Sequence, residues 1–500
     1  MKTTMFKPVI HTALAAAIAT LLSACATVGT DFAAPKAVDT PAYRHAAEAG
    51  GAGAQAGAQS ANPARLPAAW WTVFNDATLT RLEGRALHDN PNVRAAAQRL
   101  VQAQAQLGVT RAGELPTLGV SAGVSKTRTS AEAPMGVAFG HQSIKGNEYQ
   151  VGANFSYELD LWGRVRRAVE AADAQALAAQ DDRDGVMLML SGQVATAYWQ
   201  LRGLDAELAI LNNALATRRE SQQLIEARFN AGLSNELDVS RTRIERANAE
   251  ADIQEALRQR NTLEHALAVL VGASPSQPIL PPAASAVATT LPQPPAIPVG
   301  LPASLLGQRP DLAASVASLR AFNAQVGVAE GAFYPSVSLT GNFGYASETL
   351  SDLAKGSARQ FSFGPLALSI PVFEGGRNRA NLNLAKARYD EAVANHETRL
   401  LTALREVEDA LSDVQQRQQQ GNVQQEAQQA AARAVQVAQA RYDRGVSTYL
   451  DVTDAQRSAL AADRAAAQIR TQRLLAAVSV ARALGGGWSQ GKTEATVAAR

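Results

Sequence analysis

The chain has 500 residues, of which 18% are charged, and a formal net charge of +2 at neutral pH. Its lysines and arginines are interleaved with aspartates and glutamates, which argues against nucleic acid as a partner, because binding to a phosphate backbone needs a concentrated basic face. Aromatic residues make up only 5% of the chain, a composition that favours long packed helices over a bulky globular core.

Residues 1–24 have the form of a secretory signal peptide. Lys2 and Lys7 precede the apolar run HTALAAAIATLL, which is too short to span a bilayer as a mature helix. The run ends in LSAC, whose last residue, Cys25, is the only cysteine in the sequence. Cys25 therefore cannot form an internal disulfide, and the alternative role for it is a stray core thiol. Residues 25–68 include the stretch AEAGGAGAQAGAQSANPA, which predicts a flexible tether.

Most of the remaining chain is a duplication. Gly232 in FNAGLSNELDV and Gly445 in YDRGVSTYLDV are 213 residues apart (445 − 232), and Gly163 and Gly376 have the same separation. A repeat this long predicts two copies of one structural unit. The predicted segments are a first repeat at 69–272, a Pro-rich extended linker at 273–309, a second repeat at 310–487 and a C-terminal tail at 488–500.

Each repeat contains two segments with the alternation of a β-strand. From Tyr149 to Leu159 every second residue is apolar or aromatic, and the residues between them are small or polar. A phase change is expected at Gly364-Pro365 in the second repeat. The predicted strands are at about 116–126, 148–162, 336–346 and 360–373.

Strands of about ten residues with one apolar face suit a membrane-spanning β-barrel, and the alternative is a soluble antiparallel sheet. Four strands cannot close such a barrel, and an open sheet edge cannot lie in hydrocarbon. Three chains would supply twelve strands. If the strands span a membrane, we therefore expect a homotrimer that shares one barrel.

The pattern after Gly163 changes to the period of an α-helix and contains no proline up to Phe229. At ~1.5 Å per residue, about 65 residues would form a helix of ~100 Å. A second helix is predicted to run back from it, and the second repeat copies both. The predicted helices are at about 163–229, 235–271, 376–442 and 448–484.

The duplicated phrases lie at the predicted tips of these helical hairpins. Gly232 and Gly445 can adopt positive φ just past a helix end, and Asn235 and Thr448 can cap the next helix. Asp238 and Asp451 follow these caps by three residues, where a carboxylate favours a helix N-terminus.

Capping does not account for Asp454, which follows Asp451 by three residues on the same helix face. The first repeat has Arg241 at the corresponding position. The alternatives are a functional acidic pair in the second repeat and a solvated charged face.

Taken together, these motifs resemble the TolC-type outer-membrane efflux family, in its lipoprotein branch. The resemblance rests on LSAC, WWTVFNDATLTRL, LDLWGRVRRA and YDRGVSTYLDVTDAQRS, and covers about Asp31 to Gly487. It implies an α+β membrane protein in which a duplicated strand-strand-long helix-helix unit forms a trimeric twelve-stranded outer-membrane β-barrel, continued by a periplasmic α-helical barrel. It also implies a passive duct, gated at its periplasmic end, that receives small molecules from an inner-membrane transporter through a periplasmic adaptor.

The resemblance also implies roles for individual residues. Cys25 would carry a diacylglycerol and an N-acyl chain, and alanine at the next position implies sorting to the outer membrane. The residues that match the periplasmic aperture are Asp238, Tyr442, Asp451 and Asp454. Those that match the tip turns for adaptor docking are Gly232, Arg444, Gly445 and Ser447. Some family members have arginine where this chain has Ser447, so the latch between helices is expected to be weaker or to use Arg444.

Two other classes of protein fit less well. A periplasmic adaptor carries one helical hairpin flanked by β-barrel and lipoyl-like halves, whereas two hairpins are predicted here. An enzyme would need a reactive constellation, but the sequence has no Walker-type phosphate loop, and its six histidines are scattered without metal-ligand spacing. We therefore expect no enzymatic activity, no metal and no cofactor other than the lipid.

Overall fold

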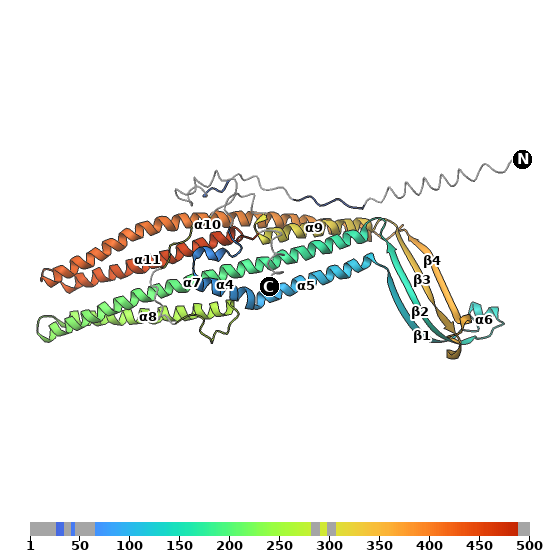
Figure 1. Cartoon of the computed structure of the whole chain (residues 1–500), viewed down its shortest axis with the longest axis horizontal. Coiled ribbons are helices and arrows are strands. Elements are labelled where there is room, and N and C mark those ends of the chain that lie inside the picture. The colour runs from blue at the N-terminus through green and yellow to red at the C-terminus, as the bar shows by residue number, and fades with distance from the viewer. Residues whose placement is uncertain (1–26, 35–41, 46–65, 282–290, 298–306, 489–500) are drawn as a thin grey trace. The chain divides into compact units, whose positions relative to one another are not determined.

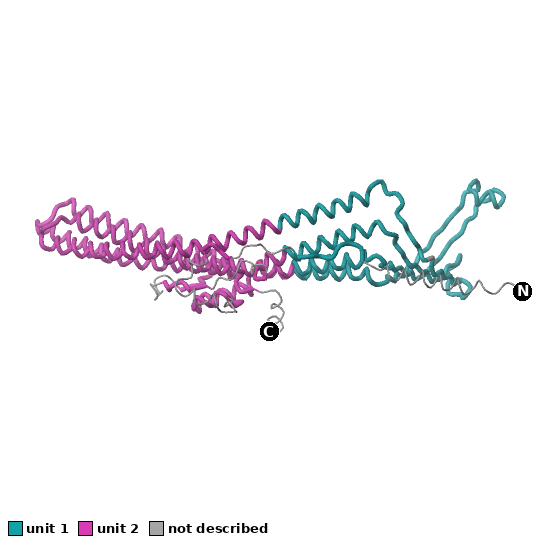
Figure 2. Tube along the Cα trace, turned by 90° about the horizontal axis from the view of Figure 1, so that it is seen from above, with its two compact units in different colours: residues 1–34, 100–178, 315–395 teal, residues 35–99, 179–314, 396–500 magenta. Residues whose placement is uncertain are grey.

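The computed structural model describes residues 27–34, 42–45, 66–281, 291–297 and 307–488. The predicted signal peptide and the lipidation site at Cys25 lie outside these residues. The chain divides into two compact units (Figure 2). Unit 1 takes residues 1–34, 100–178 and 315–395, and unit 2 takes residues 35–99, 179–314 and 396–500.

Four long helices form two hairpins (Figure 1). They are α7 (Arg164–Asn230), α8 (Glu236–Leu270), α10 (Arg377–Asp443) and α11 (Tyr449–Ala483). Helices α7 and α10 have 67 residues each, and α8 and α11 have 35 each, so the two repeats have matching lengths. The ranges predicted from the sequence differ from these bounds by a single residue at each end.

Shorter helices precede the strands of each repeat and were not predicted as elements. They are α4 (Ala77–Asp89) and α5 (Pro91–Arg111) in the first repeat and α9 (Pro310–Gly331) in the second. Helices α5 and α9 both begin at a proline, which suits the first helical position because the N–H it lacks would have no partner there. The remaining short elements are α6 (Pro134–Ala138), η2 (Trp70–Phe74), η3 (Ala112–Glu114), η6 (Leu350–Asp352) and η7 (Gly356–Ala358).

Unit 1 contains one antiparallel sheet of four strands in the order β1-β2-β3-β4. The strands are β1 (Thr117–Arg128), β2 (Lys145–Leu159), β3 (Ser336–Ser347) and β4 (Arg359–Ser369). The central pair, β2 and β3, joins the two repeats, with Val151 opposite Tyr345. Strands β1 and β4 are the edges of this sheet.

Two predicted strands extend too far at the end that joins the helices. Strand β2 ends at Leu159 rather than near residue 162, because Asp160 turns to accept the backbone N–H groups of Val165 and Arg166 at the start of α7. Strand β4 ends at Ser369 rather than near residue 373. Pro371 follows two residues later and has no backbone N–H to donate to a ladder.

The phase change predicted at Gly364-Pro365 is a β-bulge. Leu339 pairs with Leu366 and Gly341 pairs with Phe363, so two residues of β4 lie opposite the single residue Thr340. Gly364 has a φ of 95°, which glycine adopts without strain. The bulge restores the alternation, so that Phe363 and Leu366 belong to the same face.

The strand register gives the sheet one apolar and one polar face. Leu118 pairs with Phe155, which pairs with Gly341, and the neighbouring rows of this face contain mainly valine, leucine, phenylalanine and tyrosine. The opposite face contains glycine, serine, threonine, asparagine and glutamine, as in the row of Gly119 and Asn154. Several apolar side chains are well exposed in the single chain, including Val120 at 79% and Phe363 at 78%. The apolar face is thus a second hydrophobic surface, separate from the core.

The main core of unit 2 surrounds the two tryptophans of the WWTVF segment. Trp70 is 1% exposed, and its indole N–H donates to Ser191 Oγ of α7 at 3.0 Å. Gly486, which follows the end of α11, has a φ of 58°, and a Cβ there would lie 2.9 Å from the Trp70 ring. The segment therefore packs against α7 and the chain after α11. Among the described residues, no helix combines the length and apolar character needed to cross a membrane.

Candidate functional site: the hairpin tips

Both hairpin tips, which lie in unit 2, end their first helix in the same way. Gly232 and Gly445 each have a φ of 71°. The Gly232 N–H donates to Phe229 O and the Leu233 N–H to Arg228 O, at 2.9 and 2.8 Å. Gly445 and the residue after it repeat this pair of bonds, which together form a Schellman motif. The duplicated glycine therefore ends a helix that would otherwise leave carbonyl groups unpaired.

The second helix of each hairpin begins with a cap. Asn235 Oδ1 accepts the Asp238 backbone N–H at 2.9 Å, and the Asn235 side-chain amide donates to Asp238 Oδ2 at 3.0 Å. In the second hairpin the Thr448 backbone N–H donates to Asp451 Oδ2 at 3.2 Å, one arm of a capping box. Two of the three aspartates predicted at the aperture, Asp238 and Asp451, are therefore helix-capping residues.

Asp454 has no part in this cap. It is 61% exposed and lies 3.7 Å from Arg457 on the next turn of α11. In the first hairpin the corresponding residue, Arg241, forms an ion pair with Asp238 at 3.4 Å. The second tip therefore carries a second acid, which faces Arg457 of the next turn, whereas the first tip carries a base that pairs with its first acid.

A small cluster of side chains joins the two tips within one chain. Ile225 of α7, Val239 of α8, and Tyr449 and Val452 of α11 are buried against one another. Tyr442, a predicted aperture residue, packs on this cluster, with its ring 5.5 Å from that of Tyr449. The guanidinium of Arg228 lies 4.9 Å from the centre of the Tyr442 ring, within the range of a cation–π contact.

The other two tip residues have different surroundings. Arg444 is exposed and forms no ion pair with a described residue, so this single chain contains no latch through it. The Ser447 hydroxyl oxygen is buried without a hydrogen-bond partner among the described residues. A serine in this position cannot make the ion pair that an arginine could make.

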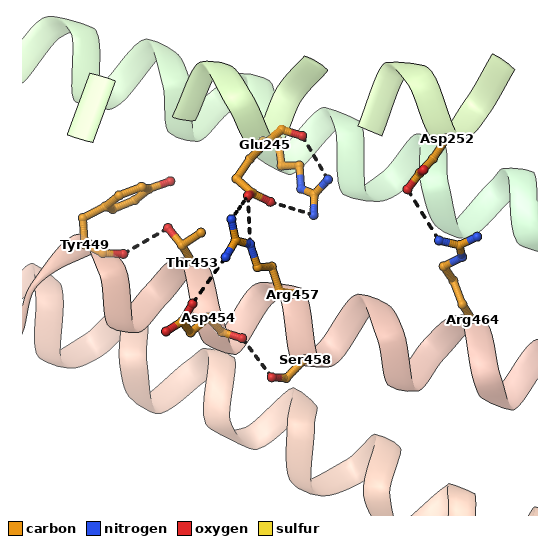
Figure 3. Close-up of polar contacts among 9 residues, drawn as sticks. Glu245, Asp252, Tyr449, Thr453, Asp454, Arg457, Ser458 and Arg464 are labelled. Carbon is orange, nitrogen blue, oxygen red and sulfur yellow. Dashed lines mark hydrogen bonds and ion pairs between the residues drawn. The ribbon is translucent and has the colours of Figure 1, made fainter. Parts of the chain in front are cut away.

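An ion-pair network among α7, α8 and α11 was not predicted from the sequence (Figure 3). Glu245 of α8 forms a buried pair with Arg218 of α7 at 3.1 Å, and both side chains are 9% exposed. Arg457 of α11 donates from both Nε and Nη2 to Glu245 Oε1, the Nε bond measuring 2.8 Å. Glu245 therefore holds one arginine from its own hairpin and one from the other.

A second contact of the same kind lies further along α11. Arg464 forms ion pairs with Glu207 of α7 at 2.7 Å and with Asp252 of α8 at 3.5 Å. In both contacts an arginine of the second hairpin meets acids of the first. We call Arg218, Glu245, Arg457, Arg464, Glu207 and Asp252 the inter-hairpin network.

The duplication contains a signal for this network in its charges. At the offset of 213 residues, Arg457 corresponds to Ile244 and Glu245 to Ser458. Arg464 corresponds to Ala251 and Arg218 to Ala431. The network lies at positions where the two repeats differ in charge. Arg241 and Asp454, which correspond to each other in the two repeats, also differ in charge. Such differences mark positions where the two hairpins meet each other and do not play equivalent roles.

Within the described residues, no group of three or more histidine, cysteine, aspartate or glutamate side chains could hold a metal ion. The tips present capped turns and exposed carboxylates, and the inter-hairpin network holds the two hairpins together.

Comparison with known proteins decides the family. The chain matches the family described as "Outer membrane efflux protein" over residues 82–273 and 301–486. The chain belongs to this family. It is an outer-membrane efflux protein of the TolC type. In this family the strands lie in the outer membrane and the helices extend into the periplasm.

Individual relatives span different systems. The chain is 36% identical over 422 residues to the toluene efflux pump outer membrane protein TtgI of Pseudomonas putida, covering 83% of this chain and 87% of TtgI. It is 32% identical over 425 residues to the cation efflux system protein CusC of Escherichia coli, covering 84% of this chain and 89% of CusC. The solved structure of the CmeC outer membrane channel of Campylobacter jejuni matches with a TM-score of 0.84 and 28% identity, over 95% of this chain and 98% of CmeC.

Proposed function

We propose that three copies of this chain close one twelve-stranded barrel and act as the passive outer-membrane duct of a tripartite efflux system. The single observation that carries the proposal is the four-stranded sheet with an exposed apolar face and two edges, β1 and β4. In hydrocarbon those edges would leave backbone N–H and C=O groups unpaired. Pairing β1 of each chain with β4 of the next satisfies them.

In such a barrel, one face of the sheet contacts lipid and the other contacts water. The apolar face, with Val120 and Phe363, meets lipid. The polar face, with Gly119, Ser121 and Asn154, lines a water-filled passage with small and uncharged groups. A lining of this kind passes many solutes and binds none tightly. The apolar face also disfavours the soluble-sheet alternative, because a soluble sheet would bury it within the fold.

The tips form the periplasmic end of the duct. Two hairpins in each of three chains place six glycine turns in a ring, three with Gly232 and three with Gly445. The repeated turn gives this end a near-sixfold outline that suits docking of the hairpins of a periplasmic adaptor. Arg444 and Ser447 belong to this docking surface.

The second-repeat tip supplies the aperture. Three copies of Asp451 and Asp454 face one narrow mouth, together with Tyr442 and, from the first repeat, Asp238. Because Arg241 pairs with Asp238, the first-repeat acid contributes less negative potential. A closed mouth of this composition conducts poorly and prefers cations.

Cargo is selected upstream, in an inner-membrane transporter that reaches the duct through the adaptor. TtgI and CusC have similar identity to this chain, yet their names assign them to toluene efflux and cation efflux. Because relatives this similar serve different cargo, the duct is not the main source of specificity. The protein carries no catalytic cofactor, and lipid on Cys25, a diacylglycerol and an N-acyl chain, adds an anchor to the barrel.

The mass of the purified complex in detergent tests the assembly. We expect a homotrimer that persists at protein concentrations well below those needed for nonspecific association. A monodisperse monomer with intact secondary structure would contradict the shared barrel and favour the soluble sheet.

A further inference from the structure

Four basic side chains lie at one end of the apolar face of the sheet. They are Lys126 and Arg128 of β1, Lys145 of β2 and Arg359 of β4, and we call them the basic row. The register places Arg128 opposite Lys145, and Arg359 opposite Tyr345, so all four continue the alternation of the apolar side chains. All four are exposed, and none has an ion-pair partner among the described residues.

Charge is segregated between the two faces of the sheet. On the strands, the basic row contains all the charged residues of the apolar face, and the two strand acids, Glu148 and Glu158, lie on the polar face. Arg128 and Lys145 are direct cross-strand partners. Like charges in that position destabilise a sheet unless an anion lies between them. The apolar face itself supplies no such anion.

Acids in the adjoining loops do not neutralise the basic row. Glu132, in the β1–β2 connection, lies 3.3 Å from His141. Asp352, in the β3–β4 connection, pairs with Lys355 at 2.7 Å. Glu348, which directly follows β3, forms no ion pair with a described residue.

Three members of the basic row, Lys126, Arg128 and Lys145, lie just outside an aromatic boundary. Tyr149 precedes these three residues on the same face, and Tyr345 lies directly opposite Arg359. Tyr157 lies near the other end of β2. Tyr157 follows Tyr149 by eight positions, which is about 26 Å along the strand at ~3.3 Å per residue and roughly 20 Å of height for a strand tilted by about 40°. An apolar band of this height flanked by aromatic side chains is typical of the lipid-facing surface of a membrane barrel. Lys126, Arg128 and Lys145 are therefore at headgroup level, and Arg359 lies at the aromatic boundary.

The row occurs at one membrane surface only. It lies at the strand ends that are joined by the hairpin loops, whereas Thr117 and Leu159, at the opposite strand ends, lead to helices. Because the helices of this family extend into the periplasm, the loop end faces the cell exterior. On the strands, the apolar face has no basic residue at the helix end.

We propose that the basic row binds the phosphate groups of the phosphorylated glycolipid that forms the outer leaflet of the outer membrane. Basic clusters beside a membrane span recognise anionic headgroups, and a guanidinium can bind a phosphate oxygen pair in a bidentate manner. The proposal rests on the trimeric barrel proposed above. In that barrel β4 of one chain pairs with β1 of the next, which places Arg359 on the strand adjacent to the one that carries Lys126 and Arg128 and gives three groups of four cations.

Lipid binding by the full-length protein tests the proposal. The purified protein is titrated with bisphosphorylated lipid A and with its dephosphorylated form, and bound lipid per chain is counted by native mass spectrometry. The test variant is Arg128→Gln with Lys145→Gln. The matched control is Arg379→Gln with Arg388→Gln, which removes two exposed arginines from α10.

We expect the parent and the control to bind bisphosphorylated lipid A at least tenfold more tightly than the test variant does. The dephosphorylated lipid should bind the parent and the test variant equally. Equal binding of bisphosphorylated lipid A by the parent and the test variant would overturn the proposal, as would equal binding of the two lipids by the parent. The mass of the assembly is measured on the same samples. Loss of trimer mass in the parent would contradict the shared barrel, whereas the number of lipids bound per chain reports on the basic row.

Discussion

Arg457 of α11 and Glu245 of α8 form one of the contacts that join the two hairpins of one chain. Both Nε and Nη2 of the arginine donate to the same carboxylate oxygen, and Glu245 also holds the buried Arg218. The contact is one-sided, because Arg457 is 53% exposed whereas Glu245 is 9% exposed. Replacing Glu245 and replacing Arg457 should therefore lower stability by different amounts.

We predict that Glu245→Gln destabilises the protein more than Arg457→Gln does. The first change leaves Arg218 buried without its carboxylate, a situation that costs about 3–5 kcal/mol in buried pairs. The second leaves the Glu245–Arg218 pair intact. Thermal unfolding followed by circular dichroism measures the difference, and Arg243→Gln, which breaks the exposed pair with Glu226, serves as control. Equal midpoints for the two variants would show that the network does not distinguish its members in this way.

The aspartate pair of the second tip should control ion passage. We predict that Asp451→Ala with Asp454→Ala raises single-channel conductance or weakens cation selectivity, and that Asp238→Ala does less because Arg241 already offsets that charge. Since Asp451 also caps α11, Asp454→Asn alone separates charge from capping. Reversal potentials in a salt gradient measure the effect. If the double variant leaves both conductance and reversal potential unchanged, these acids are capping and solvated residues only.

The buried carboxyl of Glu83 should make stability depend on pH. Its side chain is fully buried in α4 without a hydrogen-bond partner among the described residues, and burial raises its pKa to about 9. Between the ordinary carboxyl pKa near 4.5 and about 9, the unfolded chain ionises while the folded chain stays protonated. Stability contributed by this group is therefore complete below pH 4.5 and is lost as pH rises, by roughly 1.4 kcal/mol per unit.

Glu83→Gln removes this titration. We expect the midpoint of the variant to rise relative to the parent as the pH increases from about 5 to about 8, whereas Glu114→Gln, at an exposed position, should track the parent. A constant difference between the Glu83→Gln and parent midpoints across this range would contradict a protonated Glu83 in the fold.

The two faces of the sheet should respond differently to charge. Val120 and Ser121 are neighbours on β1 that point to the apolar and polar faces. We predict that Val120→Arg destabilises the membrane-inserted protein by about 2–4 kcal/mol, as expected near the middle of a bilayer, whereas Ser121→Arg is tolerated. Resistance of the trimer to heat in detergent and the amount in the outer membrane measure this. Similar losses in both variants would contradict a lipid-facing Val120.

Lipidation of Cys25 is tested independently of the barrel. Cys25→Ser should abolish incorporation of a labelled fatty acid while the protein still forms trimers, because the anchor and the strands are separate parts of the chain. Label retained by Cys25→Ser would show that the lipid is attached elsewhere.

Much of the fold could be predicted because its signals are local. The glycine and the cap at each tip, the alternation of β2 and the bulge at Gly364-Pro365 all follow from the preferences of a few adjacent residues. Strand ends were harder to predict, since β2 stops where Asp160 turns to cap α7. The count of strands in one chain indicated a trimer only if the strands span a membrane. The prediction of a duct came from the resemblance to a family.

The inter-hairpin network could not be predicted from one helix at a time. On a long amphipathic helix, Arg457 and Glu245 have the spacing of an ordinary solvated face, and only the packing of α11 beside α8 brings them together. The two residues lie 212 positions apart in the sequence. Comparing the repeats by charge as well as by glycine would have marked both positions.

Recording from planar lipid bilayers shows whether this protein forms a duct. We predict that the purified full-length protein inserts as discrete channels whose unit conductance is low and cation-selective. Asp454→Asn should reduce the selectivity without preventing insertion. Protein that is folded and trimeric by mass but produces no discrete conductance steps, in the parent and in the aspartate variants alike, would contradict its function as a duct.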